Sequence, residues 1–579
     1  MNLSLFSYLT IALAMSPLHA VAGASQDSTA TQFQPFEIRL ESTHIYEHPT
    51  DHISLFAAFT GPRGAVNEIR GFWDGDRTWR IRFSPPDAGP WTFSTSCSDR
   101  LNPGLHGIKG SFEVGRAVSG LPFSRRGWPS VSDNGRHLIY TDGTPFFWLA
   151  DTAWEMTWKS NTETMIRYLD DRKRKGFNVI QVVVLSHQIM RSFGVENRLG
   201  EKAFLDNDFA RVNPRYYDYL DRIVLEANSR GLAVALVPLW AAMTRQHSDN
   251  ETHQRLSDKD ALGLASYIGA RYAGDNVIWM IGGDNSYDSA PQREFWRNFA
   301  EAINIASGDM HLTTIHPKGL TASFDYFGEG ADWLDFHAYQ SSHLAGGTYT
   351  FRAAASGYRL KQPKPILNAE ATYEDIFHNL WEPGDTKNVH TFRIRPEHVR
   401  QSSYESILSG ALVGITYGAN GVWQWATEEI GGTHLPRTTV KEAWSFPGSF
   451  QMTVLKDIMT GHRWFEITPR PEYVVAKTPG DRYIPLARNR DNIIVYIPQN
   501  TESVVLRTYD FVIRGDQSWI DPQSGLTLNV QAPNFGRGPV VLETPDSRDW
   551  VVILHRSKQV FSWDGTQIPA SSTLHQNAP

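Results

Sequence analysis

Eight short apolar stretches recur between residues 145 and 425, and amphipathic helical segments separate them. The first four are PFFWLADTAW (145–154), FNVIQVVVLSH (177–187), LAVALVPLW (232–240) and NVIWMIGGDN (276–285). The last four are HLTTIHP (311–317), WLDFHAYQ (333–340), PILNAEATYE (365–374) and VGITYGANGVWQW (413–425). Uninterrupted apolar strands are typical of a parallel sheet that is buried on both faces. The alternation predicts an α/β fold with a (β/α)8 TIM barrel at residues 137–465.

The segments between these stretches carry helix start and stop signals. In NPRYYDYLDRIVLEANSRG, Asn213 is a candidate N-cap, Pro214 occupies the first helical position and Gly231 is a stop. A doubly wound open sheet is the alternative fold. It has less support, because no glycine-rich phosphate-binding turn follows any of the apolar stretches.

The segments on either side of the predicted barrel have a different pattern. Residues 36–118 show period-two alternation, with Trp79, Ile81 and Phe83 set against Arg80 and Arg82. This alternation predicts an N-terminal immunoglobulin-like β-sandwich at 36–118. Short apolar segments return after residue 466, and they predict a second β-sandwich over 466–579.

Charge, cysteine content and the N-terminal segment limit the classes of function. The chain has 579 residues, a net charge of −7 and one cysteine, Cys97. This charge argues against a nucleic-acid partner, and a single cysteine excludes an internal disulfide. The apolar start ends in Ala22-Gly23-Ala24, so we expect a signal peptide at 1–24 and export to a bacterial periplasm or the exterior. No later segment has the length and apolarity of a membrane span, and the oligomeric state stays open.

Polar and aromatic residues finish the eight predicted strands. In a TIM barrel the C-terminal strand ends form the active site. The abundance of aromatic residues, with 19 Trp, 21 Tyr and 30 Phe, fits sugar binding. The residues that we expect to bind substrate at these ends are Asp151, Trp154, His187, Trp240, Asn285, His316, His337, Tyr339, Trp423 and Trp425.

Two acidic residues at the strand ends are candidates for catalysis. Asp284 follows two glycines on the fourth strand, and Glu370 follows the buried segment PILNA on the seventh. Hydrolysis of a glycosidic bond requires one carboxyl group to protonate the leaving oxygen and a second to attack the anomeric carbon or to activate water. We therefore predict a glycosidase that acts on a polysaccharide or oligosaccharide, with Asp284 and Glu370 as its catalytic pair.

Three alternatives to this interpretation stay open. A glycan-binding protein could use the same barrel without catalysis, and the two flanking β domains could bind a matrix. His187, His316 and His337 could suggest a metal-dependent hydrolase, but they lack the close spacing of helix-borne zinc motifs. We therefore expect no metal and no cofactor, and activity that survives exhaustive chelation would exclude the metal-dependent class.

Several of these motifs resemble, in the same order, those of the apiosidase-like glycoside hydrolases of family 140 and their relatives. They are PFFWLADTAWEMTWK, YLDDRKRKGFNVIQVVVL, WMIGGDNS, FHAYQSSH and PILNAEATYE. The resemblance spans about 137–460 and implies Asp284 as general acid/base and Glu370 as nucleophile of a retaining enzyme. It also implies release of apiose-linked side chains from the pectin rhamnogalacturonan II. The C-terminal segment resembles a domain that is labelled as collagen-binding, although support of the barrel by packing is a simpler role.

Overall fold

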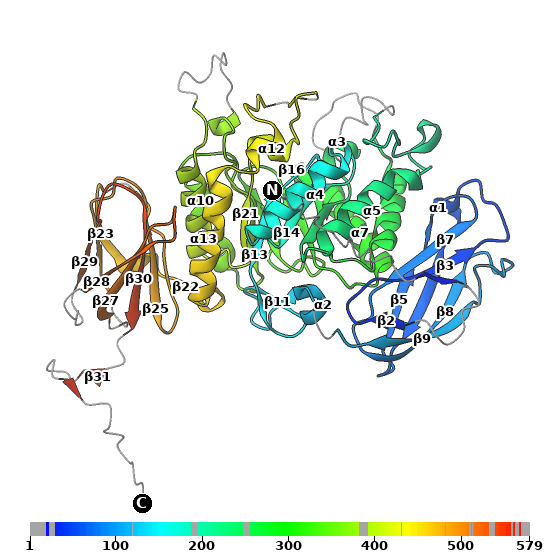
Figure 1. Cartoon of the computed structure of the whole chain (residues 1–579), viewed down its shortest axis with the longest axis horizontal. Helices are drawn as coiled ribbons and strands as arrows, with labels where there is room; N and C mark the ends of the chain where they lie inside the picture. The colour runs from blue at the N-terminus through cyan, green and yellow to red at the C-terminus, as the bar shows by residue number, and fades with distance from the viewer. Residues whose placement is uncertain are drawn as a thin grey trace, which may run out of the picture.

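The chain folds into a central α/β domain with a β-rich domain on each side (Figure 1). Figure 1 places the N-terminal β strands at one end of the molecule and the C-terminal strands at the other. In the computed structural model of the chain, the described residues are 19–21, 29–117, 120–186, 195–246, 255–380, 392–429, 431–432, 434–480, 482–508, 511, 513–531, 539–556, 560–561 and 567–568.

The N-terminal domain consists of two facing sheets, in the orders β1-β3-β7-β6 and β2-β9-β8-β4-β5. Inward residues of both sheets, such as Phe36 and Ile81 on one and Phe59 and Phe112 on the other, form one buried core. Most of the expected leader, residues 1–18 and 22–24, lies outside the described residues, as do residues 25–28. The elements here are β1 (His19–Val21), β2 (Thr29–Thr31), β3 (Phe36–Glu41), α1 (Pro49–His52), β4 (Leu55–Thr60), β5 (Val66–Arg70), β6 (Phe72–Trp73), β7 (Thr78–Phe83), β8 (Gly89–Cys97) and β9 (Lys109–Gly115).

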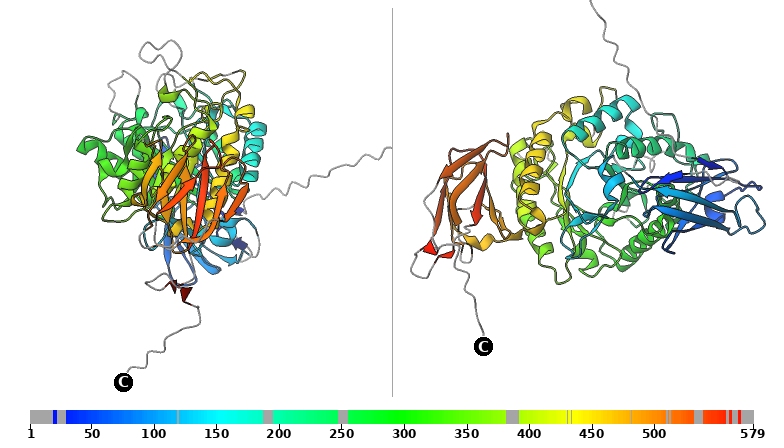
Figure 2. Two further views of the ribbon diagram at one scale, coloured as in Figure 1. Left: turned by 90° about the vertical axis from the view of Figure 1, so that its left-hand side faces the viewer. Right: turned by 60° about the horizontal axis from the view of Figure 1, so that its bottom comes forward.

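The central domain contains eight parallel strands in two sheets, and helices surround them (Figure 2). Six strands form a curled sheet in the order β17-β16-β15-β14-β13-β21, and β19 pairs with β20 in a second sheet. Each predicted stretch contains one of these strands. Their bounds are β13 (Trp148–Thr152), β14 (Val179–Val183), β15 (Ala233–Val237), β16 (Val277–Asn285), β17 (Thr313–Pro317), β19 (His337–Gln340), β20 (Ile366–Glu370) and β21 (Gly414–Tyr417).

Helices and short strands connect these eight strands. The predicted start of α5 is confirmed, because the Asn213 side chain accepts a hydrogen bond from the backbone N–H of Arg215, and Pro214 opens the helix. Gly231 lies three residues beyond the helix end with a positive φ of 75°. The connecting elements are α2 (Pro122–Arg126), β10 (Pro129–Val131), β11 (Leu138–Tyr140), β12 (Pro145–Phe146), α3 (Met156–Lys159), α4 (Thr162–Arg174), α5 (Pro214–Asn228), α6 (Asp258–Arg271), α7 (Ala290–Ser307), β18 (Thr321–Ala322), α8 (Ser323–Phe327), α9 (Tyr349–Tyr358), α10 (Pro396–Leu408), α11 (Asn420–Trp423), α12 (Val440–Ala443) and α13 (Pro447–Gly461).

The last predicted strand of the central domain is too long. The apolar stretch 413–425 forms a strand only as far as Tyr417, and residues Asn420–Trp423 form the short helix α11. Gly418-Ala419-Asn420-Gly421 lies between them, and glycines and asparagine end strands readily. Trp423 therefore comes from a helix and not from a strand end.

The C-terminal domain also has two sheets, in the orders β22-β24-β25-β30-β27-β28 and β23-β26-β29. Buried residues of both, including Ile493 and Trp519 on one and Val504 and Leu542 on the other, form its core. Within the described residues no helix combines the length and apolarity of a membrane span. The strands of these two sheets are β22 (Thr468–Pro469), β23 (Val474–Thr478), β24 (Leu486–Arg488), β25 (Asn492–Ile497), β26 (Ser503–Leu506), β27 (Ile513–Ile520), β28 (Thr527–Gln531), β29 (Val540–Glu543) and β30 (Trp550–Arg556). After them, β31 (Val560–Phe561) and β32 (Gln567–Ile568) pair with each other.

A buried ion pair joins the C-terminal domain to the central domain. The Arg400 guanidinium on α10 donates two hydrogen bonds of 2.8 Å to the Asp549 carboxylate, and both side chains are buried. Tyr496 donates to the same carboxylate at 2.9 Å and stacks on Tyr404 of α10. A charge that is buried without its partner is costly, so this contact depends on both residues.

We predict that Asp549→Asn destabilises the protein by about 3–5 kcal/mol, because it leaves the Arg400 charge buried and uncompensated. Thermal unfolding of the full chain measures the effect. The control is Asp546→Asn, three residues earlier, which removes a carboxylate from an exposed pair with Arg548 and changes stability by no more than about 1 kcal/mol. Equal small shifts in both variants would contradict the role of the buried pair.

Candidate active site

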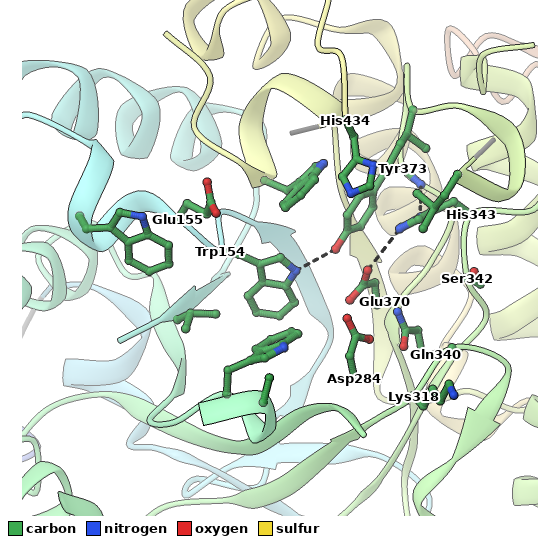
Figure 3. Close-up of a pocket in the computed structure, with 18 residues that line it drawn as sticks. Trp154, Glu155, Asp284, Lys318, Gln340, Ser342, His343, Glu370, Tyr373 and His434 are labelled. Carbon is green, nitrogen blue, oxygen red and sulfur yellow. Dashed lines mark hydrogen bonds and ion pairs between the residues drawn. The ribbon is translucent and has the colours of Figure 1, made fainter. Parts of the chain in front are cut away.

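A cleft of about 500 Å³ lies where the parallel strands of the central domain end, and Figure 3 shows the residues that line it. One wall is aromatic, and the floor carries two carboxyl groups, those of Asp284 and Glu370. Lys318, Gln340, Ser342 and His343 lie together on the opposite side of the floor (Figure 3). The aromatic residues of the lining are Trp154, Trp158, Trp240, Tyr373 and Trp423.

A backbone distortion at the end of β16 places Asp284 in the cleft. Gly282 pairs with His316 and Asn285 with Pro317, so that Gly283 and Asp284 bulge out of the ladder. The φ angles of Gly282, Gly283 and Asp284 are all positive, at 70°, 150° and 41°. A Cβ on Gly283 would lie 2.5 Å from the Trp240 ring. Gly283 therefore permits both the turn and the close packing of Trp240. The bulge directs the Asp284 side chain into the cleft.

The pKa of Asp284 is raised to about 6. Desolvation is the largest cause of the increase, although the Asp284 side chain remains accessible to solvent from the cleft. The negative charge of Glu370 adds to the increase, while His316 and a hydrogen bond from Gln340 oppose it. Asp284 therefore carries its proton in mildly acidic solution.

Glu370 has the opposite pKa shift. Burial alone would raise its pKa, but contacts with two imidazoles outweigh burial and lower it. His316 Nε2 lies 3.1 Å from Oε2 of Glu370, and His343 Nε2 lies 3.3 Å from Oε1. Burial lowers the pKa of His316, yet the bond to Glu370 raises it overall. Glu370 is therefore held as a carboxylate with one imidazole on each oxygen.

Hydrogen bonds connect His343, one of the two imidazoles beside Glu370, to the aromatic wall of the cleft. The backbone N–H of Tyr373 donates to His343 Nδ1 at 3.4 Å, so Nε2 of that ring carries the proton that faces Glu370. Trp154 Nε1 donates to the Tyr373 hydroxyl at 3.1 Å, and the His343 and Tyr373 rings pack 4.3 Å apart. These contacts fix the orientation of the groups around Glu370 (Figure 3).

Several of the predicted site residues meet at this cleft. Asp284, Glu370, Trp154, Trp240 and Trp423 line it directly. His316 is fully buried beneath the floor, where it contacts Glu370 and packs against Trp154 and Trp240. Asn285, next to Asp284 in the chain, is fully buried and does not line the cleft; its side-chain amide nitrogen lies 3.4 Å from the Gln246 carbonyl oxygen.

Other predicted substrate-binding residues do not reach the cleft, and the expectation is wrong for them. Asp151 is buried against α4, where Arg172 donates at 2.5 Å and Tyr168 at 2.7 Å to its carboxylate. His337 is buried beside Ser323 and Phe324, Tyr339 is buried near Tyr349, and Trp425 packs on Tyr168. His187 lies outside the described residues.

The reason for the errors at Asp151, His337 and Tyr339 is the direction of their side chains. Along β13, Trp148 and Ala150 belong to the core that the strands enclose, whereas Leu149 packs outward against the helices. Asp151 has the outward direction of Leu149. In β19, Ala338 faces inward, so His337 and Tyr339 face outward. A continuously apolar strand hides this alternation in the sequence.

The sequence analysis missed several polar and aromatic residues of the cleft, six of which show where such residues lie. Gln340 ends β19, while the others lie after strand ends or on loops: Glu155, Lys318, His343, Tyr373 and His434. Alternation along β19 could have revealed Gln340, which faces the same way as Ala338. The loop residues follow no periodic pattern, so no comparable signal marks them.

Asp284, His316 and Glu370 could also be considered as metal ligands, because each offers one ligand atom within 4.8 Å of the others. However, both oxygens of Glu370 already face imidazole nitrogens. The raised pKa of His316 favours its protonated form, which has no lone pair for a metal. The donor set therefore fits a pair of carboxyl groups in different protonation states better than it fits a metal centre.

We predict that the Asp284 carboxyl titrates near pH 6 and that Glu370→Gln moves this midpoint to lower pH, because the substitution removes the neighbouring negative charge. Carbon-13 NMR of labelled aspartate carboxyls measures it. Glu374→Gln is the matched control: Glu374 is buried on Tyr417 and Gly448, outside the cleft lining, and should not affect Asp284. A midpoint that does not move in Glu370→Gln would contradict the coupling.

Comparison with known proteins agrees with this geometry. A solved structure named "Glycoside hydrolase" is 27% identical with a TM-score of 0.66, over 76% of this chain and 99% of that chain. A glycoside hydrolase family 5 structure from Bacteroides vulgatus ATCC 8482 is 26% identical with a TM-score of 0.65, over 75% and 95%. A third structure, from the same organism, is 18% identical over 92% and 100%, with a TM-score of 0.66, and shows the shared fold.

The family comparison covers the central domain as a whole. No curated protein matches the chain. Residues 29–98 match a domain of unknown function (DUF5060). Residues 132–466, which include both carboxyl groups of the cleft, match the family described as apiosidase-like, catalytic domain. The chain belongs to this family, and it is a glycoside hydrolase.

Proposed function

We propose that this glycoside hydrolase is retaining, with Glu370 as nucleophile and Asp284 as general acid and base. The observation that carries the proposal is that an oxygen of Asp284 and an oxygen of Glu370 lie within 4.8 Å of each other. Retaining enzymes hold their two carboxyl groups about 5–5.5 Å apart, and inverting enzymes about 6.5–9.5 Å apart. The short separation favours direct attack by Glu370 over attack by an interposed water.

In the first step, the ionised Glu370 attacks the anomeric carbon while the glycosidic C–O bond breaks. Asp284 gives its proton to the leaving oxygen, so the first products are an alcohol and a glycosyl ester of Glu370. In the second step, the Asp284 carboxylate takes a proton from water. The water oxygen attacks the anomeric carbon and releases Glu370. The opposite pKa shifts of the two groups support this division of roles.

The two imidazoles that contact Glu370 assist by positioning. They hold both oxygens of the nucleophile in place before the sugar arrives, so little reorganisation is needed in the transition state. His343 donates from Nε2 to one oxygen of Glu370, while His316 compensates the negative charge from beneath the floor.

The proposed substrate is a plant cell-wall or related polysaccharide, with apiose-linked side chains of rhamnogalacturonan II as the specific case. Membership of the apiosidase-like family supports this choice. The tryptophans that line the cleft offer apolar faces on which sugar rings stack. A protein that only binds glycans is the alternative. Binding alone would not require two carboxyl groups with opposite pKa shifts. The shifts therefore favour an enzyme over a binding protein.

We also propose that the two parallel sheets are parts of one closed (β/α)8 barrel, the catalytic domain of residues 137–465. Backbone hydrogen bonds at both junctions support closure. Asp335 N–H donates to Thr313 O at 2.9 Å beside β17, and Val413 N–H donates to Ile366 O at 3.2 Å beside β20. In this arrangement the sandwiches at 36–118 and 466–579 support the barrel from outside. The Arg400–Asp549 pair favours such a packing role for the second one.

We predict that Glu370→Gln reduces hydrolysis of a natural glycan to background, because an amide cannot form the glycosyl ester. Asp284→Asn should lower kcat/KM about 10²–10⁴-fold on that glycan, yet spare substrates with very good leaving groups, which need little protonation. We expect wild-type activity to decline above about pH 6, where Asp284 loses its proton, and this decline should disappear in Asp284→Asn. Product release from a panel of pectic and other plant glycans measures these effects.

The same panel includes Glu374→Gln as the matched control, which should retain wild-type rates. Apiose-terminated products from wild type would establish the specific substrate. A different sugar, still lost in Glu370→Gln, would keep the mechanism and reject that substrate. Wild-type rates in both Glu370→Gln and Asp284→Asn would show that the proposed pair is wrong.

A further inference from the structure

One end of the cleft contains a carboxylate that the proposed mechanism does not use. Glu155 follows β13, lies on the opposite side of the floor from Lys318 (Figure 3) and is only 4% exposed. Among the residues that the structure describes, Lys159 is the group that contacts this carboxylate, in a buried ion pair. The Lys159 ammonium also donates to the Gln424 carbonyl oxygen at 3.0 Å.

The ion pair with Lys159 is the structural role that the described residues give the Glu155 carboxylate. Glu155 precedes α3, but its side chain makes no capping hydrogen bond to that helix. Other bonds already fix α3: Thr157 Oγ1 donates to Val183 O at 2.8 Å, and Glu155 N–H donates to Trp423 O at 3.1 Å. Burial of an ion pair costs desolvation energy that an apolar pair would not require. A carboxylate retained at this cost in a cleft is a candidate for ligand binding.

The surroundings of Glu155 supply the other features of a sugar subsite. Trp154, Trp158, Val183 and Trp423 line the same cleft, and Trp158 is adjacent to Lys159 in the chain. The Trp158 indole N–H is buried, and the described residues offer it no acceptor. A sugar ring presents C–H faces, which suit indole rings, and hydroxyl groups that can both donate to a carboxylate and accept from an N–H.

We infer that Glu155 and Trp158 form a hydroxyl-binding subsite that selects the sugar unit bound at this end of the cleft. The inference rests on the proposed function and deepens it. The Glu155 carboxylate accepts hydrogen bonds from sugar hydroxyls, and the Trp158 indole N–H donates to a hydroxyl oxygen. Lys159 keeps the carboxylate compensated and fixed in direction. A sugar that lacks the recognised hydroxyl leaves these buried groups unpaired and is therefore rejected.

The test compares Glu155→Gln with wild type on the glycoside that wild type hydrolyses in the glycan panel and on its monodeoxy analogues. Glu155→Gln should lower kcat/KM on the parent glycoside about 10–100-fold, as expected for loss of a hydrogen bond to a charged group. One deoxy analogue, which lacks the recognised hydroxyl, should be hydrolysed equally by wild type and variant. Glu163→Gln, an exposed glutamate on α4 paired with Arg167, is the matched control and should leave both rates unchanged.

Two further variants distinguish loss of sugar recognition from a loss of folding stability. Glu155→Gln combined with Lys159→Met removes the unpaired buried charge, and Trp158→Phe removes the N–H donor while retaining an aromatic ring. Both should discriminate less than wild type between the parent glycoside and a deoxy analogue. Unchanged kcat/KM in Glu155→Gln, or equal losses on the parent and every deoxy analogue, would overturn the subsite alone. No hydrolysis of any glycan by folded wild type would overturn the proposed function and the subsite together.

Discussion

The chemistry of this cleft depends on one interaction, the contact of Glu370 with His316 and His343. Without these imidazoles, burial would raise the pKa of Glu370, and two neighbouring carboxyl groups would compete for a single proton. With them, Glu370 stays ionised and its charge helps to raise the pKa of Asp284. The same contacts thus create both a nucleophile and a proton donor in one solvent-accessible cleft.

Local departures from regular strand geometry bring the two groups together. The Gly282-Gly283-Asp284 bulge aims Asp284 into the cleft at the end of β16. On β20 the pairing shifts by one residue, since Tyr339 pairs with Asn368 but Gln340 pairs with Glu370. Such a shift changes the face on which the next side chain lies. Glu370 therefore points toward the cleft although Ala369, its neighbour, also faces inward.

The strands and both carboxyl groups could be predicted because each leaves a local signal in the sequence. Apolar stretches mark the strands, and the acidic residues follow them directly. The direction of a side chain leaves a weaker signal, which explains why Asp151 was expected to bind substrate although it pairs with Arg172 behind the sheet. His343 and Tyr373 could not be predicted, since their place beside Glu370 depends on how two loops fold back over the strands.

The most direct test of the central claim is to trap the glycosyl ester on Glu370. A 2-deoxy-2-fluoro glycoside of the released sugar with a good leaving group slows the second step, and peptide mass spectrometry locates the adduct. The account predicts one fluorinated sugar per chain, attached to Glu370. No adduct, together with a released sugar of inverted anomeric configuration, would contradict it.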